Sequence, residues 1–175
     1  MRQIFNISNL LSIFRLLLAL PLFIFLSNED YSLALVICFI AYVTDLLDGY
    51  FARKLNQISE LGKIFDPLAD KVFVFVLALM LLIQGKIPLW FFIVVVSRDV
   101  LILFGGLFMK NKTRNVPASN MYGKVTVFVV AFTLLLSMLN ILGDEYMNYL
   151  MLLSVFVLLL SFVVYLNRFI KQVKK

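Results

Sequence analysis

Four aspartates recur at helical spacing in an otherwise hydrophobic part of the chain. Asp45 and Asp48 are three positions apart, and Asp66 and Asp70 are four positions apart. Either spacing places both carboxylates of a pair on one face of an α-helix. Clustered carboxylate oxygens suit magnesium, manganese or calcium, and two such ions about 3.5–4 Å apart commonly promote displacement at phosphorus. Because magnesium usually keeps phosphate oxygens among its ligands, the pattern predicts a phosphate-bearing substrate.

Small and basic residues accompany the aspartates. Gly49 lies in a segment expected to be helical, where glycine costs roughly 1 kcal/mol relative to alanine. Its missing side chain would let a ligand or a neighbouring helix approach the backbone, and Ala52 and Gly62 are also small. Arg53 returns to the helix face of Asp45 and can pair with a phosphate. These residues extend the predicted site toward a phosphate-containing ligand.

A purely structural interpretation explains part of this pattern. Asp66 followed by Pro67 is typical of a helix N-cap with proline at the first helical position. Glycines commonly pack helices together. Capping does not explain Asp45, Asp48 and Asp70 in the same short stretch, so we favour a functional site.

Composition places these residues in a membrane protein. The chain has 175 residues, 63% of them hydrophobic, and a mean hydropathy of +1.01. Soluble domains are about 45–50% apolar. This length predicts a single domain over residues 1–175. The absence of histidine excludes Ser-His-Asp, Cys-His and His-ligated zinc chemistry, and the one cysteine, Cys38, is expected to be a packing residue.

The elements that must position the aspartates are transmembrane helices. A spanning helix needs about 20 mostly apolar residues. Six segments approach this length, at about 8–27, 31–52, 65–85, 88–109, 123–143 and 146–168. The sequence therefore predicts an all-α integral membrane protein with six transmembrane helices. The second and third are antiparallel and joined by a short loop, so all four aspartates should converge at one depth.

The charges between the spans predict the orientation. With the N-terminus inside, twelve of the sixteen basic residues fall in inner segments: Arg2, Arg53, Lys54, Lys63, Lys110, Lys112, Arg114, Lys124, Arg168, Lys171, Lys174 and Lys175. The positive-inside rule then makes both termini cytoplasmic. These residues would attract the anionic inner leaflet of the membrane lipids, whereas nucleic acid is not an expected partner.

Charged residues inside the spans predict the position of the active site. A central aspartate or arginine costs about 2.5–3.5 kcal/mol on insertion scales, so such residues usually face a polar cavity. The predicted orientation puts all of them toward the cytoplasmic ends of their helices: Arg15, Asp45, Asp48, Asp66, Asp70, Lys71, Arg98 and Asp99. We therefore expect one water-accessible active site at the cytoplasmic side.

The aspartate pattern resembles the signature of a known family. Asp45-x2-Asp48-Gly49-x2-Ala52-Arg53-x8-Gly62-x3-Asp66-x3-Asp70 matches the signature of the CDP-alcohol phosphatidyltransferases at every fixed position. The segment from Asn6 to Arg15 is similar to the N-terminal segment of the family, with Ser8 and Ser12 where proline or threonine is usual. The resemblance covers nearly the whole chain.

This resemblance implies a reaction and a role for each matching residue. Family members transfer a phosphatidyl group from CDP-diacylglycerol to an alcohol and release CMP. It implies two Mg2+ or Mn2+ ions held by Asp45, Asp48, Asp66 and Asp70, with Asp70 also acting as the general base. It assigns CDP binding to Asp45, Gly49, Ala52, Arg53, Gly62 and Asn9. It also implies a homodimer, and a small multispan lipid enzyme fits a bacterial cytoplasmic membrane.

The alcohol acceptor is less closely specified. Basic residues that could bind an anionic acceptor are Arg98, Arg114 and Lys124, with Lys112 nearby. Arg98 need not pair with Asp99, because adjacent helical residues do not face each other. The arginine–acidic pair and the later Gly-Lys resemble phosphatidylglycerophosphate synthases, which use glycerol 3-phosphate. The same region resembles cardiolipin synthases, which use phosphatidylglycerol, and inositol phosphate and serine remain open.

Two other classes of protein bind ions or diphosphates through clustered carboxylates. Intramembrane prenyltransferases carry their aspartate motifs on well-separated helix pairs, unlike the closely spaced pairs here. A cation transporter is the alternative from outside the enzymes, but it needs polar residues that reach both membrane faces. The outer halves of these spans, such as VFVLALMLLI, contain almost no polar residues, which argues against a transporter.

Overall fold

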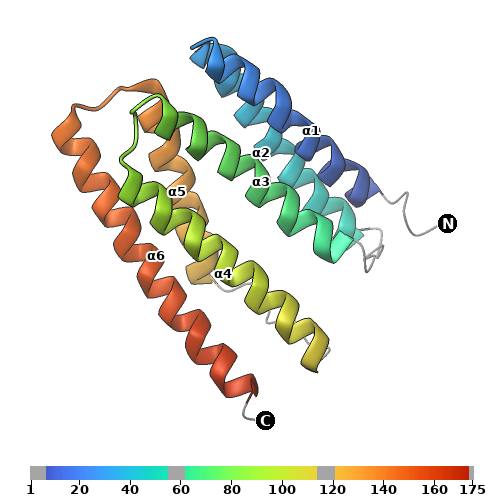
Figure 1. Ribbon diagram of the computed structural model, residues 1–175. Coiled ribbons are helices and arrows are strands. Elements are labelled where there is room, and N and C mark those ends of the chain that lie inside the picture. The colour runs from blue at the N-terminus through green and yellow to red at the C-terminus, as the bar shows by residue number, and fades with distance from the viewer. Residues whose placement is uncertain (1–6, 55–61, 114–120, 174–175) are drawn as a thin grey trace. The chain divides into compact units, whose positions relative to one another are not determined.

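The fold is a set of six α-helices. The computed structural model describes residues 7–54, 62–113 and 121–173. Within these ranges the regular elements are α1 (Ile7–Ser27), α2 (Tyr31–Lys54), α3 (Gly62–Ile83), α4 (Leu89–Thr113), α5 (Met121–Leu139) and α6 (Asp144–Val173), all helical (Figure 1). The all-α prediction is confirmed, and each helix overlaps one predicted span.

Local backbone signals explain where the helices end. α5 stops at Leu139, before the predicted boundary at 143, because Asn140 adopts a left-handed conformation with φ 50°. α2 begins after Asp30, whose Oδ1 accepts a hydrogen bond from the Leu33 backbone N–H at 3.1 Å. The predicted N-cap at Asp66 is wrong, because α3 already begins at Gly62.

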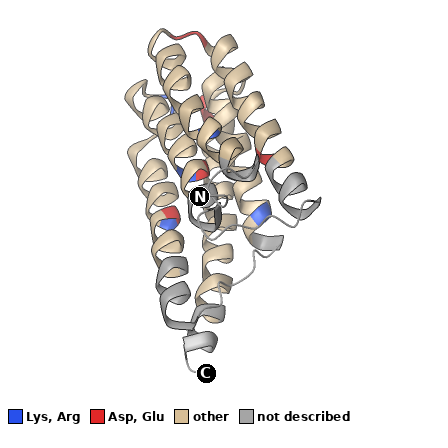
Figure 2. Ribbon diagram, turned by 90° about the vertical axis from the view of Figure 1, so that its right-hand side faces the viewer, with Lys and Arg blue, Asp and Glu red and all other residues tan. Residues whose placement is uncertain are grey.

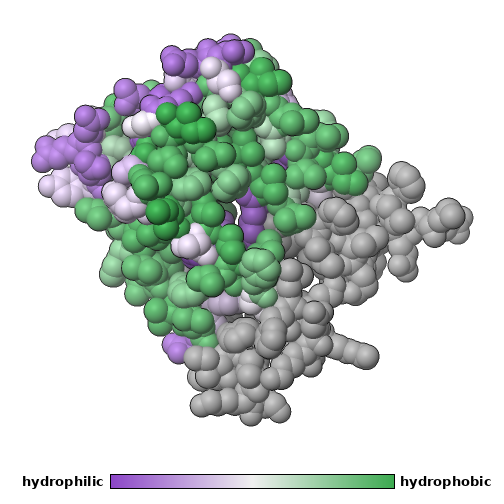
Figure 3. All heavy atoms as spheres, in the orientation of Figure 1, coloured by the Kyte–Doolittle hydropathy of each residue, from purple (hydrophilic) through white to green (hydrophobic). Residues whose placement is uncertain are grey.

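Apolar side chains dominate the surface of the described residues. Hydrophobic residues cover most of the visible face (Figure 3), and charged residues interrupt the described helices at few positions (Figure 2). Within the described ranges, two helical segments are long and apolar enough to cross a membrane, Leu10–Ser27 and Asp144–Asn167. Tyr31–Leu47 and Gly123–Leu139 are shorter apolar helical segments. Such a surface is suited to contact with lipid.

The chain divides into two compact units, Met1–Met80 and Leu81–Lys175. In the first unit α1 packs side by side with α2 (Figure 1). One stripe of α1 is buried, at Ser12, Arg15, Leu18, Ala19, Leu22 and Leu26, which is the spacing of a single helix face. Ala34 and Ala41 are buried on α2, and small residues of this kind allow close helix approach. Arg15 is therefore held within the packed face of α1.

In the second unit, hydroxyl groups join the packed helices. α6 packs against both α4 and α5. Between α5 and α6, the Thr133 and Ser154 hydroxyls lie 2.7 Å apart and both residues are fully buried. Ser137 Oγ lies 3.4 Å from Met147 Sδ in the same interface. Such hydrogen bonds stabilise helix pairs in lipid, where apolar side chains gain little from leaving the solvent.

The turn between α3 and α4 is also fixed by hydrogen bonds. Gly85 has φ 70°, a left-handed conformation that glycine adopts without strain. The following Lys86 donates from Nζ to the Met138 backbone carbonyl at 2.6 Å. This contact ties the turn to the C-terminal end of α5.

Candidate functional site

A buried arginine joins two of the predicted metal-binding aspartates. Arg15 on α1 donates from Nη1 to Asp70 Oδ1 on α3, and the same nitrogen lies 3.2 Å from Asp45 Oδ1 on α2. The arginine side chain is 3% exposed, whereas the Asp45 and Asp70 side chains are 54% and 47% exposed. The two carboxylates therefore meet at one point and still present surface to an incoming ligand.

Buried residues on α2 and α3 position these two aspartates. Thr44, immediately before Asp45, is buried and donates from Oγ1 to the Ala41 carbonyl at 2.7 Å. Ala69, immediately before Asp70, is 3% exposed. Each aspartate thus follows a residue anchored in the packed interior. Asp45 and Asp70, one from each predicted pair, therefore converge as expected. The convergence of Asp48 and Asp66 stays a prediction.

For the other predicted donor-site residues, the structure describes the position of the backbone in the helices and not the side chains. Asp48, Gly49, Ala52 and Arg53 continue α2, and Gly62 and Asp66 belong to the start of α3. Asn9 lies in the first turn of α1. The helical spacing of both aspartate pairs is therefore confirmed. The side chains of these seven residues lie outside the described part of the structure.

The described residues fit a divalent cation in donor chemistry and in charge. Asp45 and Asp70 supply carboxylate oxygens, the ligands that magnesium and manganese prefer. Their convergence on a guanidinium shows that the site between them already favours positive charge. Among the described side chains no third acidic, histidine or cysteine ligand joins them, and the predicted partners Asp48 and Asp66 fall outside that set.

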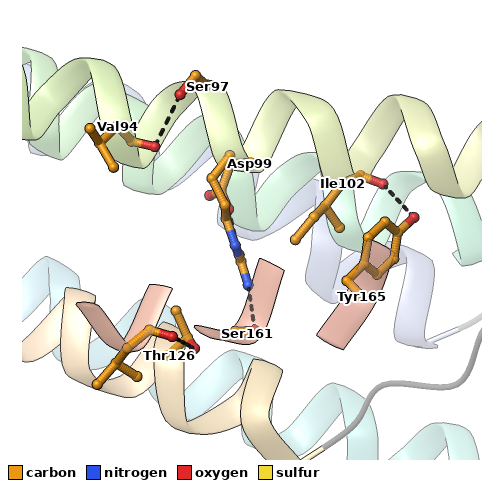
Figure 4. A network of polar contacts seen from close by, with 9 residues as sticks. Val94, Ser97, Asp99, Ile102, Thr126, Ser161 and Tyr165 are labelled. Carbon is orange, nitrogen blue, oxygen red and sulfur yellow. Dashed lines mark hydrogen bonds and ion pairs between the residues drawn. The ribbon is translucent and has the colours of Figure 1, made fainter. Parts of the chain in front are cut away.

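A second polar cluster surrounds Arg98 on α4. Arg98 is 8% exposed, and its Nη1 donates to Asp99 Oδ1 at 2.7 Å (Figure 4 shows this network). Its Nη2 lies 3.5 Å from Ser161 Oγ on α6. The sequence left open whether the adjacent Arg98 and Asp99 pair. The structure shows that they do, because the guanidinium is long enough to reach the neighbouring carboxylate. Within the described structure Arg98 Nε has no hydrogen-bond partner.

Two contacts from α6 and α5 complete the surroundings of Arg98 in Figure 4. Tyr165 donates from its hydroxyl to the Ile102 carbonyl at 3.4 Å, and Thr126 Oγ1 lies 3.5 Å from the Val157 carbonyl. Ser161 itself is 3% exposed. These contacts hold α4, α5 and α6 together around the buried guanidinium.

The remaining predicted acceptor residues differ in how they are placed. Lys124 is exposed near the start of α5. The side chain of Lys112 and the whole of Arg114 lie outside the described residues. Of Lys112, Arg114 and Lys124, the structure therefore describes the side chain of Lys124. This side chain is open to solvent or lipid headgroups.

Sequence reasoning missed the direct role of Arg15 in the aspartate cluster. Arg15 was recognisable as a charge within a hydrophobic run, and it shares a helix face with Ser12, Leu18 and Leu22. That periodicity indicates burial, but it does not identify the partner helix. Ser161 was also missed. A lone serine in an apolar helix carries no spacing signal.

Comparison with known proteins shows where this combination of features occurs. The family model for CDP-alcohol phosphatidyltransferase matches residues 5–164. The chain is 38% identical over 178 aligned residues to a CDP-diacylglycerol–glycerol-3-phosphate 3-phosphatidyltransferase of Aquifex aeolicus, with 97% of this chain and 99% of the relative covered. It is 40% identical to a protein of the same name from Bacillus subtilis, covering 58% of this chain and 53% of that one.

A relative with a different name also matches. The chain is 39% identical over 113 residues to the cardiolipin synthase (CMP-forming) of Rattus norvegicus, covering 64% of this chain but 37% of the longer relative. The family match includes both aspartate pairs, Arg15 and Arg98. Residues 5–164 therefore carry the aspartate cluster and the buried arginines as parts of one recognised enzyme domain, and the chain belongs to the CDP-alcohol phosphatidyltransferase family of membrane enzymes.

Proposed function

We propose that this enzyme transfers the phosphatidyl group of CDP-diacylglycerol to glycerol 3-phosphate and releases CMP. The observation that carries the proposal is the match to the Aquifex aeolicus enzyme, whose name states this donor and acceptor and which aligns along almost its whole length. The family match over residues 5–164 supports treating residues 1–175 as one functional domain.

The donor site lies at the two aspartate pairs. Asp45, Asp48, Asp66 and Asp70 would hold two divalent ions, Mg2+ or Mn2+. When bound, such ions neutralise the negative charge of the pyrophosphate and make the phosphorus a better electrophile. Gly49, Ala52 and Gly62 would leave room for the CDP group, and Asn9, Arg53 and Asp45 would contact it. The convergence of Asp45 and Asp70 on the guanidinium of Arg15 supports this assignment, because it shows that the two carboxylates can share one positive charge.

Asp70 takes the proton in the transfer step. The acceptor hydroxyl oxygen forms a bond to the phosphorus that carries diacylglycerol, and the bond from this phosphorus to the oxygen of CMP breaks. The hydroxyl proton goes to Asp70, and CMP leaves with the electron pair of the broken bond. A carboxylate is the natural base in a chain without histidine. Asp70 is also nearly half exposed, which supports its contact with substrate.

Arg98 binds the phosphate of the acceptor, with Arg114 and Lys124 adding positive charge. Its guanidinium is buried, and Nε lacks a hydrogen-bond partner within the described structure. A buried donor of this kind is costly unless a ligand satisfies it. A phosphate group suits the planar fork of an arginine, which supports an anionic acceptor.

Cardiolipin synthesis is the second candidate function. The rat cardiolipin synthase shares 39% identity with the chain over 64% of its length. Phosphatidylglycerol is also anionic, so Arg98 would suit both acceptors. The reaction at the donor would be unchanged, and only the alcohol would differ.

The helices would cross a bacterial cytoplasmic membrane six times, with both termini and the active site on the cytoplasmic side. The positive-inside distribution and the exposed apolar helix faces support this orientation. The enzyme would act as a homodimer.

An acceptor screen tests the proposed function. Purified enzyme with magnesium and CDP-diacylglycerol is offered glycerol 3-phosphate, phosphatidylglycerol, inositol phosphate or serine, and the lipid products are identified by mass. We expect phosphatidylglycerophosphate with glycerol 3-phosphate and no product with the others. Cardiolipin as the main product would favour the second candidate. If neither glycerol 3-phosphate nor phosphatidylglycerol gives a lipid product, both candidate functions are contradicted.

A further inference from the structure

The least explained feature of the aspartate cluster is the arginine at its centre. Arg15 Nη1 contacts Oδ1 of both Asp45 and Asp70. These two aspartates are the predicted metal ligands whose side chains the structure describes. One positive charge therefore occupies the place between two carboxylates that the proposed function assigns to divalent cations.

Packing alone does not account for an arginine at this position. The neighbours of Arg15 on the buried stripe of α1 include Leu18, Leu22 and Leu26, and a hydrophobic residue would continue that stripe. A buried guanidinium is costly unless carboxylates compensate it. Here Asp45 and Asp70 provide that compensation from two different helices. The arginine thus belongs to the carboxylate site rather than to the apolar core.

Arginine and a metal ion would make competing demands on the same groups. Asp45 and Asp70 cannot turn the same oxygen lone pairs toward both Arg15 and a cation. A guanidinium next to a divalent ion is also repelled by it, and this repulsion is strong where water is excluded.

We propose that Arg15 is a built-in counter-cation, which holds Asp45 and Asp70 together before the metal arrives and is displaced from them when it binds. This inference rests on the metal role of Asp45 and Asp70 in the proposed function. Arg15 is a positioning residue, because it acts through the two aspartates.

The two effects of Arg15 on metal affinity have opposite signs. Holding the aspartates together favours metal binding, whereas competition and repulsion oppose it. Repulsion between charges of +1 and +2 acts at near-contact distance, while the two helix anchors at Thr44 and Ala69 already orient the aspartates. Competition should therefore dominate, and removal of the charge should tighten metal binding. Coupling between sites typically amounts to about 5- to 150-fold in affinity.

Manganese titration of the purified full chain in detergent measures this coupling without any turnover. Free Mn2+ is followed by electron paramagnetic resonance for wild type, Arg15→Gln, Asp45→Asn and Lys86→Gln. Lys86 is the matched control, since its substitution also removes one positive charge but lies beyond the end of α3, about 20 Å along that helix from Asp70. We expect Arg15→Gln to bind Mn2+ at least about fivefold tighter than wild type, with Lys86→Gln unchanged and Asp45→Asn weaker.

Unchanged or weaker Mn2+ binding by Arg15→Gln would overturn the counter-cation role. If that variant does not fold, Arg15→Lys serves instead, because a single ammonium keeps the charge but contacts two carboxylates less well than a guanidinium. Its affinity should then lie above that of wild type, and an equal or lower affinity would overturn the proposal.

The same titration separates this inference from the metal assignment. If Asp45→Asn binds Mn2+ as well as wild type does, the aspartates are not the metal ligands, and both proposals fail. If Asp45→Asn loses binding while Arg15→Gln matches wild type, only the role of Arg15 fails.

Discussion

At the residue scale, the described structure contains two charged clusters, one of carboxylates around Arg15 and one around Arg98. Asp45 and Asp70 converge on Arg15, and Arg98 is held by Asp99 and Ser161. Both arginines are buried in largely apolar helices. A buried guanidinium is costly for the fold unless carboxylates or a ligand compensate it, which is a reason to look for a role of each arginine.

Arg98→Gln tests the acceptor side. Loss of a charged hydrogen bond to a phosphate costs about 1.5–3 kcal/mol, so we expect KM for the acceptor to rise by roughly 10- to 100-fold. KM for CDP-diacylglycerol should stay within about twofold. Steady-state kinetics with each substrate varied in turn measure both values.

Asp99→Asn is the matched control for this prediction. It removes the partner of Arg98 but keeps the guanidinium, so the acceptor KM should change much less than in Arg98→Gln. If instead Arg98 only compensates Asp99, both variants will lose thermal stability and the acceptor KM of neither will change.

Sequence reasoning at this scale succeeded where the signal was periodic. The spacing of Asp45 and Asp48 and of Asp66 and Asp70 predicted shared helix faces, and α2 and α3 confirm it. The pairing of Arg15 with Asp70 could not be predicted, because spacing along one helix does not reveal which helix packs against it. The pairing of Arg98 with Asp99 was left open by the sequence, because the Cβ positions of adjacent helical residues do not decide whether a long side chain reaches its neighbour.

At the element scale, close helix packing depends on small residues. A Cβ added at Gly105 on α4 would lie 2.8 Å from the Tyr165 hydroxyl on α6. Most helix ends lie within three residues of the predictions, including the start of α3 at Gly62. The larger differences are the ends of α4 (113 against 109), α5 (139 against 143) and α6 (173 against 168). A left-handed asparagine and a helix start before an Asp-Pro step are both set by local backbone conformation, which hydrophobic patterning does not encode.

Gly105→Ala should weaken the α4–α6 interface. Overpacking typically costs about 1–3 kcal/mol, partly offset by the roughly 1 kcal/mol that alanine gains over glycine in a helix. We expect a lower melting temperature in detergent. Tyr165→Phe removes the crowding oxygen, so the same Gly105→Ala change should be neutral or stabilising in that background. An equal loss in both backgrounds would contradict the contact.

At the scale of the whole molecule, the charge distribution predicts the orientation in the membrane. The apolar surface and the twelve basic residues of the predicted inner segments are consistent with six crossings. Two helical segments reach full spanning length within the described ranges. Arg98 and Asp99 lie within α4, and Asp45 and Asp70 lie within α2 and α3.

Cysteine labelling tests this orientation. In a Cys38→Ser background, a single cysteine replaces Lys86 or Lys112, and intact cells are treated with a membrane-impermeant maleimide. The positive-inside rule predicts labelling of Lys86→Cys in intact cells and of Lys112→Cys only after permeabilisation. The reverse pattern would place the aspartates on the outer side.

The most direct test of the proposed reaction is the release of CMP from CDP-diacylglycerol with glycerol 3-phosphate as acceptor. We expect release that requires magnesium or manganese, stops with a chelator, and returns when the metal is restored. Asp70→Asn should lower the rate by at least about 100-fold, the usual contribution of a general base. CMP release that continues without metal, or at near wild-type rate in Asp70→Asn, would contradict metal-dependent transfer with Asp70 as the base.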